Sequence, residues 1–279
     1  MILRILLFLF GIGFGISALA DDVAPPQPDA GASGTPELSG RDIYERVLAN
    51  RHKAYFQKQQ LVSTDAGGAS YTTEVWTRWK DGRDDDGKLK RGVRSKTLAK
   101  YTKPREVRGV GYLIIQKEEP PNDQFVYLPS ARRVRRVNLG EAIMGTDYSI
   151  EDIIPRDIES SEYERVADEA VDGVPCFVVE IHPKPGAGSQ YSKLLVYVEK
   201  EHYVAIRARY WSLDGVEVKE SRTPAAEIEE VEGVWLTRRA TMRNLVDDSS
   251  TTLTIVEMEP NASIRDSLFT QRYLEQKAR

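Results

Sequence analysis

Residues 125–153 read FVYLPSARRVRRVNLGEAIMGTDYSIEDI, and this stretch decides how the whole chain is interpreted. It begins with strand-forming residues and continues into a cluster of arginines, so we expect one strand over residues 124–137. Gly145-Thr146-Asp147 then breaks the strand pattern, and we expect Thr146 or Asp147 to cap a following helix. The stretch predicts a sheet with a short helical segment beside it.

From residue 71 onward, the sequence shows a series of strand patterns separated by turn dipeptides. Dipeptides at 172–173, 214–215 and 232–233 end in glycine and predict two-residue hairpins, because such turns need positive φ. The expected strands are 71–80, 91–102, 106–117, 124–137, 163–171, 174–182, 192–199, 204–213, 217–226, 234–245 and 251–258. Since one all-β domain can reach about 250 residues, the pattern predicts a single curled antiparallel sheet and not several domains.

The N-terminus predicts export. Arg4 precedes an apolar run over residues 5–16, and Ala18-Leu19-Ala20 is a small-x-small cleavage pattern. The run is shorter than the ~20 residues that span a bilayer, so we expect residues 1–20 to be a signal peptide cleaved after Ala20 and the protein to be periplasmic. Residues 21–38 are rich in proline and small residues and predict a disordered tether, followed by one domain over 39–279 that opens with a helix capped by Ser39.

Composition excludes several classes of function. The net charge of −4 argues against a nucleic-acid partner, and the single cysteine, Cys176, allows no intramolecular disulfide. The three histidines show no metal spacing, no serine lies in a G-x-S-x-G motif, and the acidic loop 81–90 fails the spacing of a calcium loop. We therefore expect no catalytic residue, no metal and no cofactor.

Two expected strands, 106–117 and 192–199, are apolar on both faces. Leu194, Val196 and Val198 share one face of strand 192–199, while Leu195 and Tyr197 share the other. A sheet with one face in water alternates cleanly between apolar and polar residues, so a second surface must be sheltered here, by more protein or by a ligand.

Residues 125–129, 132–136 and 145–152 resemble the signature of LolA-like outer-membrane lipoprotein-sorting proteins, whose members often carry Tyr-Leu-Pro, basic residues and then Gly-Ser/Thr-Asp-Phe/Tyr. Residues 265–269 and Leu274 resemble the closing element of that family, so the likeness spans residues 38 to 276. It implies a mainly β fold, a strongly curved antiparallel sheet forming an incomplete barrel closed by short helices, with residues 145–154 as part of the closing plug. It also implies a cavity for acyl chains, for which we expect as lining Tyr112, Ile114, Phe125, Tyr127, Met144, Tyr148, Ile150, Leu194, Val196 and Val198. Which face of each strand points inward stays open, because a slip of one residue swaps the faces.

The arginine cluster allows two interpretations. Arg132, Arg133, Arg135 and Arg136 could form cross-strand pairs with acids such as Glu162 and Glu164. Alternatively they form a recognition patch for an anionic group or an acidic partner. We predict the recognition patch, and we predict that Gly145, Thr146 and Asp147 form a lid hinge.

The sequence thus predicts a non-catalytic periplasmic carrier or chaperone whose partners are the acyl chains of a lipid or lipoprotein. An inner-membrane RND-type transporter or an outer-membrane acceptor is a further expected partner. Alternative functions are a protein-interaction module of the cell envelope, acting as a sensor or assembly factor, and an accessory protein of an RND-type lipid exporter.

Overall fold

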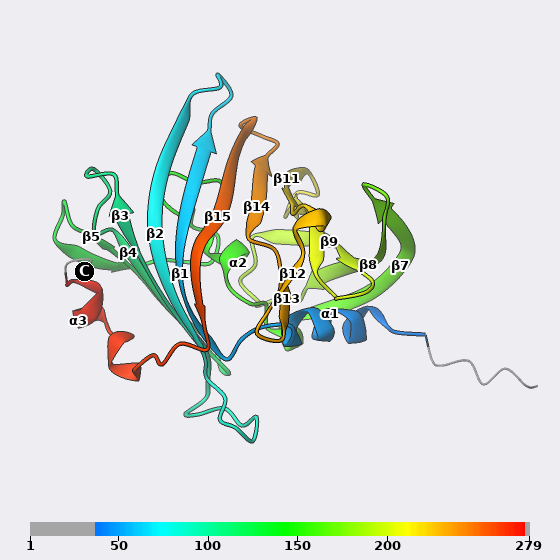
Figure 1. Ribbon diagram of the computed structural model, residues 1–279, viewed down its shortest axis with the longest axis horizontal. Helices are drawn as coiled ribbons and strands as arrows, with labels where there is room; N and C mark the ends of the chain where they lie inside the picture. Colours follow the sequence, from blue (N-terminus) through cyan, green and yellow to red (C-terminus); the bar gives the residue numbers. More distant parts are fainter. Residues whose placement is uncertain (1–36, 277–279) are drawn as a thin grey trace, which may run out of the picture. The chain divides into compact units, whose positions relative to one another are not determined.

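A computed structural model of the protein describes residues 37–276, and one large antiparallel sheet dominates them (Figure 1). Thirteen strands lie in the order β6-β5-β4-β3-β2-β1-β15-β14-β11-β10-β9-β8-β7, and within the described residues the two end strands do not pair with each other. The predicted mainly β fold with a curved sheet that is not closed into a barrel is confirmed. The predicted signal peptide and most of the predicted tether lie outside the described residues.

The strand bounds follow the turn signals of the sequence closely in the second half of the chain. In sequence order, the strands are β1 (Ala54–Thr64), β2 (Ser70–Asp81), β3 (Val93–Lys103), β4 (Gly111–Lys117), β5 (Asp123–Leu128), β6 (Arg133–Arg136), β7 (Ser161–Val171), β8 (Val174–Pro183), β9 (Tyr191–Glu199), β10 (Ala205–Ser212), β11 (Glu217–Arg222), β12 (Glu229–Val231), β13 (Val234–Leu236), β14 (Arg239–Asn244) and β15 (Ser249–Pro260). The short strands β12 and β13 form a separate hairpin.

Three expectations for the strands need correction. Strand β1 was not expected, because its sequence AYFQKQQLVST mixes polar residues into the pattern. The single strand expected over 124–137 is the hairpin β5–β6, since the chain turns after Leu128 and Arg132 adopts a left-handed φ of 47°. The strand expected over 234–245 is divided into β13 and β14.

The first helix, α1 (Gly40–Ala49), begins where the sequence predicts. Ser39 caps it, and a reciprocal capping box joins Ser39 to Asp42. A side chain at Gly40 would meet the backbone of Glu164 at 2.6 Å, so only glycine allows α1 to approach β7 this closely. The other α-helices are α2 (Ile150–Ile153) and α3 (Gln271–Leu274), and no helix within residues 37–276 is long and apolar enough to cross a bilayer.

Both faces of the sheet are covered, which explains the apolar residues on both sides of the strands. The concave face packs against α1 through Ile43 and against α2 through Ile150. The convex face is covered at one end by the C-terminal residues 261–276, here called the strap, and at the other by the β12–β13 hairpin. Leu274 of the strap packs with Leu98 and Leu113 on the convex side. The convex face is therefore sheltered by protein at its two ends, while the concave face is covered by the helices and the segments that join them.

One buried lysine fastens the strap. Lys100 lies on β3 with only 1% of its surface exposed, and its Nζ donates to the carbonyl oxygens of Tyr273 (3.2 Å) and Gln276. Burial, together with the nearby charge of Arg78, lowers the pKa of Lys100 from 10.5 to about 8. The ammonium form is therefore costly in the folded state near neutral pH.

This lysine predicts a pH dependence of stability. Between pH 8 and 10.5 the unfolded chain keeps the proton that folded Lys100 has lost, so the free energy of unfolding should rise through this window. Relative to Lys100→Met, the wild-type protein should gain up to about 3 kcal/mol across it. Urea unfolding at several pH values measures the difference. Lys58→Met, at an exposed ion pair with Glu257, is the control, and parallel curves for wild type and Lys100→Met would contradict the prediction.

Candidate functional site

Residues 139–157, here called the plug, lie across the concave face of the sheet (Figure 1). The plug starts as a tight loop in which Ala142 and Ser149 form a β-bridge and the amide of Ile143 donates to the carbonyl oxygen of Tyr148 (2.8 Å). Helix α2 follows, and Ser149 and Asp152 form its capping box. The predicted plug is present, with its helix beginning at Ile150.

The expected helix cap at Thr146 or Asp147 is wrong, because Asp147 bonds to the sheet instead. Its carboxylate accepts hydrogen bonds from the hydroxyls of Ser249 and Thr251 on β15. Ser63 on β1 donates to the carbonyl oxygen of Gly145 (2.6 Å), whose φ of 71° suits glycine. These bonds fasten the loop to two strands. That the loop is a hinged lid stays a prediction.

Three tyrosines fasten the plug further. Tyr101 donates to the carbonyl oxygen of Met144 (2.8 Å), and the amide of Met144 donates to the hydroxyl of Tyr112 (2.9 Å). Tyr148 reaches the opposite wall and donates to the carbonyl oxygen of Ala240 (3.2 Å). Burial raises the pKa of all three phenols, so they remain neutral hydrogen-bonding groups at physiological pH.

Asp152 is the most buried charge in the plug. Its side chain has no exposed surface, its Oδ2 lies 2.9 Å from the Nζ of Lys219 on β11, and its Oδ1 accepts from the hydroxyl of Tyr191 on β9 (2.8 Å). The carboxylate also accepts from the amide and hydroxyl of Ser149 (both 2.8 Å). A buried carboxylate is tolerated only when it is paired and fully hydrogen-bonded, and these contacts meet that need.

A cavity of about 230 Å³ remains between the plug and the sheet. Its walls come from β1 to β4, β14, β15 and the plug. They are mainly aliphatic and aromatic, with a few amide and hydroxyl groups and the carboxylate of Asp152 among them. The lining residues are Tyr55, Gln59, Leu61, Val75, Thr77, Thr97, Ala99, Tyr101, Tyr112, Ile114, Ile143, Thr146, Tyr148, Asp152, Ile153, Ala240 and Leu253. An apolar pocket with a few polar groups suits an apolar ligand.

The structure brings together some of the predicted lining residues and separates others. Tyr112, Ile114 and Tyr148 line the cavity. Ile150 and the β9 residues Leu194, Val196 and Val198 are buried in the same concave core without lining it, whereas Met144 is 37% exposed. Phe125 and Tyr127 lie on the convex side and pack with the strap, because Val126 takes the inward position of β5.

The sequence interpretation missed much of the wall. Leu61, Val75, Ala99 and Leu253 line the cavity and were not among the expected residues. Leu61 lies on the strand that was not expected, and the sequence carries no signal that separates Val75 or Ala99 from other residues of an ordinary core.

The predicted recognition patch lies away from the cavity, on and beside the edge strand β6. Arg135 pairs with Glu141, and Arg136 pairs with Asp123 (2.9 Å) and covers the ring of Phe125. Arg132 and Arg133 are exposed. The expected pairs with Glu162 and Glu164 are not formed, since those residues lie on β7 at the other end of the sheet. Whether the patch binds a partner stays a prediction.

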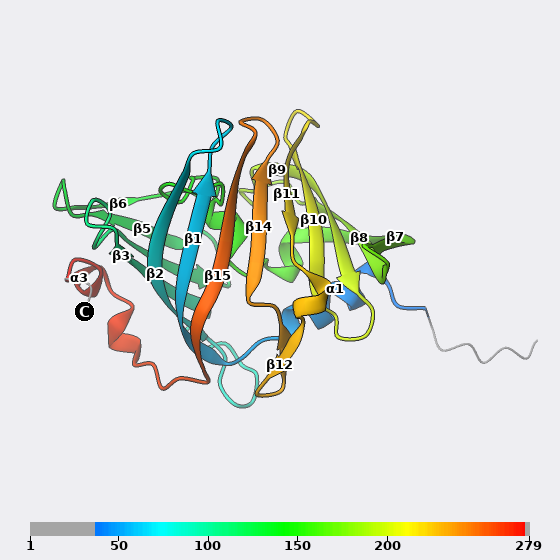
Figure 2. The same cartoon turned by 45° about the horizontal axis from the view of Figure 1, so that its top comes forward.

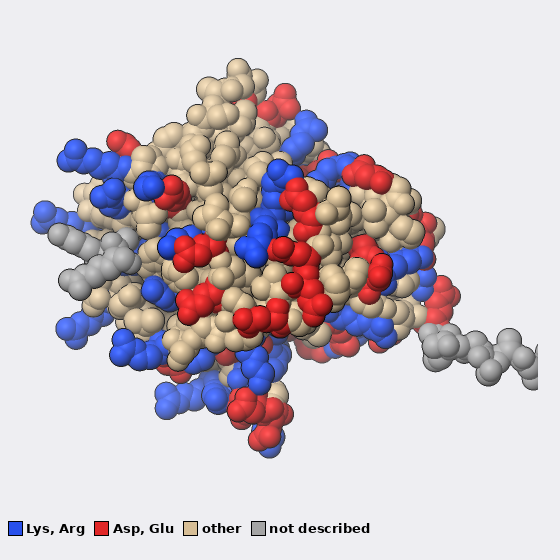
Figure 3. Space-filling view, viewed as in Figure 1, with Lys and Arg blue, Asp and Glu red and all other residues tan. Residues whose placement is uncertain are grey.

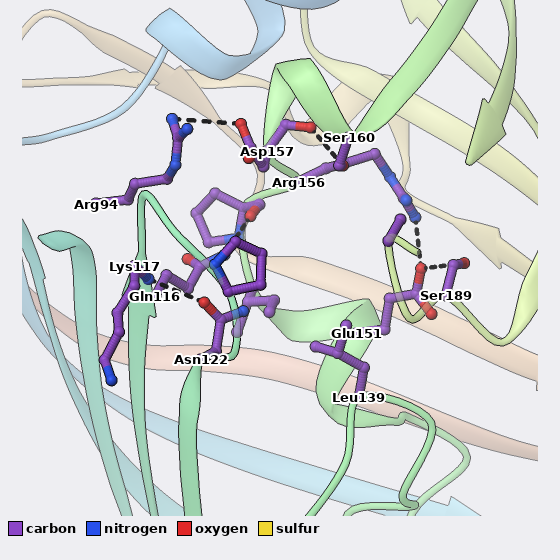
Figure 4. A pocket seen from close by; sticks show the side chains of 14 residues that line it. Arg94, Gln116, Lys117, Asn122, Leu139, Glu151, Arg156, Asp157, Ser160 and Ser189 are labelled. Carbon is purple, nitrogen blue, oxygen red and sulfur yellow. Dashed lines mark hydrogen bonds and ion pairs between the residues drawn. The ribbon is translucent and has the colours of Figure 1, made fainter. Parts of the chain in front are cut away.

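A smaller hollow of about 90 Å³ lies on the other side of the plug (Figure 4). In Figure 4, Arg94 points toward Asp157 while the side chain of Arg156 extends to Glu151. Gln116 on β4 donates to the carbonyl oxygen of Pro155 (2.8 Å) and fixes the plug between these charges. The plug thus has an apolar space on one side and a strongly charged hollow on the other.

Exposed apolar side chains gather at one end of the strands. The tips of the hairpins β1–β2, β10–β11 and β14–β15 lie together there (Figure 2). Of the seven exposed large apolar residues within 37–276, six lie at these tips or in the plug loop beside them: Tyr71, Met144, Leu213, Val216, Leu245 and Val246. Figure 3 shows the β1–β2 tip as largely uncharged. We call these six residues the apolar rim. Exposed apolar side chains gathered in one region of the surface are typical of an interaction site.

One group within the described residues could hold a metal ion: Glu199, Glu201 and His202 bring three ligand atoms within 4.8 Å of one another. The turn between β9 and β10 already explains this arrangement, because Glu199 accepts hydrogen bonds from the amides of Glu201 and His202. The ring of His202 packs on Trp235. The group is a turn-forming cluster and is remote from the cavity wall.

The Asp152 contacts predict a large effect on stability. Asp152→Ala should leave the Lys219 ammonium buried without its partner and lower the free energy of unfolding by about 3–5 kcal/mol. Urea unfolding measures this loss, and Asp214→Ala in an exposed turn should change the stability by less than about 0.5 kcal/mol. The double variant Asp152→Leu/Lys219→Met should recover much of the loss. A loss below about 1 kcal/mol in Asp152→Ala would contradict the role given to the pair.

Known proteins place this geometry in a family. A family model described as an uncharacterized protein matches residues 93–276, and the model of DUF1329, a protein family of unknown function, matches residues 23–141. A search of curated proteins finds no match.

Solved structures match nearly the whole domain. A DUF1329 family protein from Desulfovibrio piger is 25% identical, with a TM-score of 0.76 over 84% of this chain and 97% of that one. A domain from Vibrio parahaemolyticus named for outer membrane lipoprotein sorting is 22% identical, with a TM-score of 0.76 over 85% and 98%. A LolA superfamily protein from Nitrosomonas europaea is 18% identical, with a TM-score of 0.67 over 85% and 100%. The chain belongs to the uncharacterized family whose model matches residues 93–276, and its fold is the LolA-like fold that the sequence predicts.

Proposed function

We propose that the protein is a periplasmic carrier or chaperone that shelters an acyl chain of a lipid or lipoprotein between the plug and the concave sheet. The observation that carries this proposal is the mainly apolar cavity of about 230 Å³ beneath the plug. The names of the structural relatives, a lipoprotein-sorting domain and a LolA superfamily protein, support a carrier role. The role needs no catalytic residue, and the predicted signal peptide supports export.

The shape of the cavity suits a chain better than a compact ligand. On β1 alone the lining runs from Tyr55 to Leu61, which corresponds to about 20 Å at the rise of a β-strand. Each buried methylene contributes about 0.8 kcal/mol, so a partly buried chain already binds with useful affinity. A carrier must also release its cargo, and a moderate affinity allows this.

An acyl chain can enter the cavity only if part of the plug moves away from the sheet. The cavity is smaller than the ~300–1,000 Å³ of sites for drug-sized ligands. The bond from Ser63 to the carbonyl oxygen of Gly145 is an exposed hydroxyl contact that contributes about 1 kcal/mol. The bonds from Ser249 and Thr251 to the carboxylate of Asp147 would also have to break, and each contributes about 1.5–3 kcal/mol. We propose that the loop opens at Gly145 while Asp152 keeps the plug fastened at its other end.

A carrier also needs surfaces that meet a donor and an acceptor, such as an RND-type transporter in the inner membrane or an outer-membrane acceptor. The apolar rim supports such contacts, and it would equally serve the alternative function of a protein-interaction module. Asp65, Asp214 and Asp247 lie in the same hairpin turns, so the rim suits a partner with an apolar surface bordered by basic residues. Binding of acyl chains distinguishes the two functions, because only the carrier requires it.

The cavity proposal predicts the effect of filling the space. Ala99 lies on β3 in the cavity wall, so Ala99→Phe should place a ring in the space for the chain and weaken binding of a fluorescent fatty acid by at least about tenfold. Fluorescence titration measures the dissociation constant. Val256→Phe, at a position that is 58% exposed, is the matched control and should bind like the wild-type protein. Wild-type protein that binds no acyl chain, or a folded Ala99→Phe that binds normally, would refute the proposal.

A further inference from the structure

The apolar cavity does not end at the plug, because two further hollows follow it toward the end of the sheet opposite the hairpin tips. The first, about 280 Å³, shares Tyr55, Asp152 and Ile153 with the cavity. The second, about 290 Å³, shares Arg51 and Pro155 with the first. We call the second hollow the arginine vestibule; it is lined by Glu45, Leu48, Ala49, Arg51, Arg83, Arg94, Ser95, Gln116, Pro155, Arg156, Asp157 and Ile158.

Four arginines from four separate segments line this vestibule. Arg51 lies between α1 and β1, Arg83 in the connection between β2 and β3, Arg94 on β3 and Arg156 in the plug. Their side chains are partly buried, from 11% exposed for Arg156 to 36% for Arg83. Four guanidiniums around one hollow repel one another, and partial burial reduces the screening by solvent.

The carboxylates around the vestibule do not pair with these arginines one for one. A single carboxylate, Asp81, pairs with both Arg51 (3.1 Å) and Arg83 (3.3 Å). Arg156 pairs with Glu151 (3.0 Å). Glu45 lines the hollow, but it pairs with Arg41 outside it (2.9 Å).

Arg94 is the arginine with spare capacity for hydrogen bonding. Its NH1 lies 3.3 Å from Asp157, whereas its Nε is buried and has no hydrogen-bond partner among the described residues. Asp157 in turn accepts a hydrogen bond from the amide of Glu159 (3.2 Å). Four guanidiniums thus pair with the three carboxylates Asp81, Asp157 and Glu151. Arg51 and Arg83 have to share Asp81, and the Nε of Arg94 remains without an acceptor among the described residues.

The environment of Arg51 also favours the binding of an anion. Burial lowers the pKa of its guanidinium, and the nearby charge of Arg83 acts in the same direction, against the effect of Asp81. An additional anion in the vestibule would relieve this repulsion and could accept charge-assisted hydrogen bonds from several guanidiniums.

We infer that the arginine vestibule binds the anionic headgroup, phosphate or carboxylate, of an amphiphile whose acyl chain lies in the cavity. The inference rests on the proposed carrier function and adds the class and orientation of the cargo. The shared residues place the head near Arg51, at the start of β1, and the chain along β1 toward the hairpin tips. A neutral amphiphile would offer these guanidiniums no charged acceptor and should bind less tightly.

The test compares two ligands that share one acyl chain: lysophosphatidylglycerol, which is anionic, and the monoacylglycerol, which is neutral. Calorimetry or displacement of a fluorescent fatty acid gives the dissociation constants for the full-length mature protein. Arg94→Gln should weaken lysophosphatidylglycerol by about tenfold and change the monoacylglycerol by less than about twofold. Arg94→Lys, which keeps the charge, should lose less than Arg94→Gln.

Two further variants keep the result interpretable. Arg83→Gln changes a more exposed arginine whose ion pair lies within its own turn, so it should weaken the anionic ligand even if Arg94→Gln fails to fold. Arg243→Gln removes the same charge from the β14–β15 hairpin, where Arg243 pairs with Asp248 (3.5 Å), and should bind both ligands normally. Equal losses for both ligands, or no loss for either, in folded vestibule variants would overturn the inference.

The remaining outcomes separate this inference from the carrier proposal. Wild-type protein that binds neither ligand contradicts the carrier function, and the vestibule proposal falls with it. Wild-type protein that binds both equally, with no effect of Arg83→Gln or Arg94→Gln, refutes the vestibule alone. If inorganic phosphate by itself binds as tightly as lysophosphatidylglycerol and requires Arg94, the vestibule is a site for a free anion, and the amphiphile inference is overturned.

Discussion

The structure depends on one buried carboxylate, Asp152, which fastens the plug inside a sheet that does not close. A curved sheet without a plug would expose the part of its concave apolar face that α1 does not cover, at a cost of about 25 cal/mol for each Å². Asp152 prevents this by joining the plug to Lys219 on β11, to Tyr191 on β9 and to its own helix cap at Ser149. A buried ion pair contributes little net stability, but its loss is costly, so it specifies where the plug lies. Hydrophobic packing alone would not define that position as sharply.

An open sheet also has edges, and this accounts for the arginine cluster in physical terms. Strand β6 is an end strand of the sheet, and its sequence is RVRR. Unpaired edges invite association with other strands, and charged side chains on the edge discourage it. The opposite end strand, β7, is approached by α1 through Gly40, which covers part of it. The same arginines can protect an edge and still be open to a partner, so the two roles do not exclude each other.

The sequence predicted the sheet well because hairpins are encoded locally. Asp172-Gly173 and Glu232-Gly233 both adopt positive φ at each residue, as two-residue turns require, and Ser39 caps α1 as expected. The cavity was harder to predict, because its walls come from strands that are far apart in the sequence and from the inward face of each. Phe125 and Val126 show the limit: both are apolar neighbours on one strand, and only the register of the sheet decides which points to the plug. The arginine vestibule could not be predicted from the sequence, because its arginines come from four separate segments. The contiguous arginines at 132–136 are visible in the sequence, and they lie at the edge strand β6 and not at the vestibule.

The two ends of the strands differ in the polarity of their side chains. At the hairpin tips, the chain uses Leu, Val and Tyr beside turns that contain aspartate, while at the other end of β1 it places guanidiniums around a hollow. Between them lies a cavity whose walls carry small or flexible contacts, such as Ala99 and Ala240, where a filled core would carry larger side chains. A core left unfilled costs packing energy. The plug is held by a fully buried carboxylate at Asp152, whereas at Gly145 it is held by an exposed hydroxyl contact from Ser63. If the protein is the carrier proposed above, opening at the loop end would let a chain enter or leave while Asp152 keeps the other end of the plug in place.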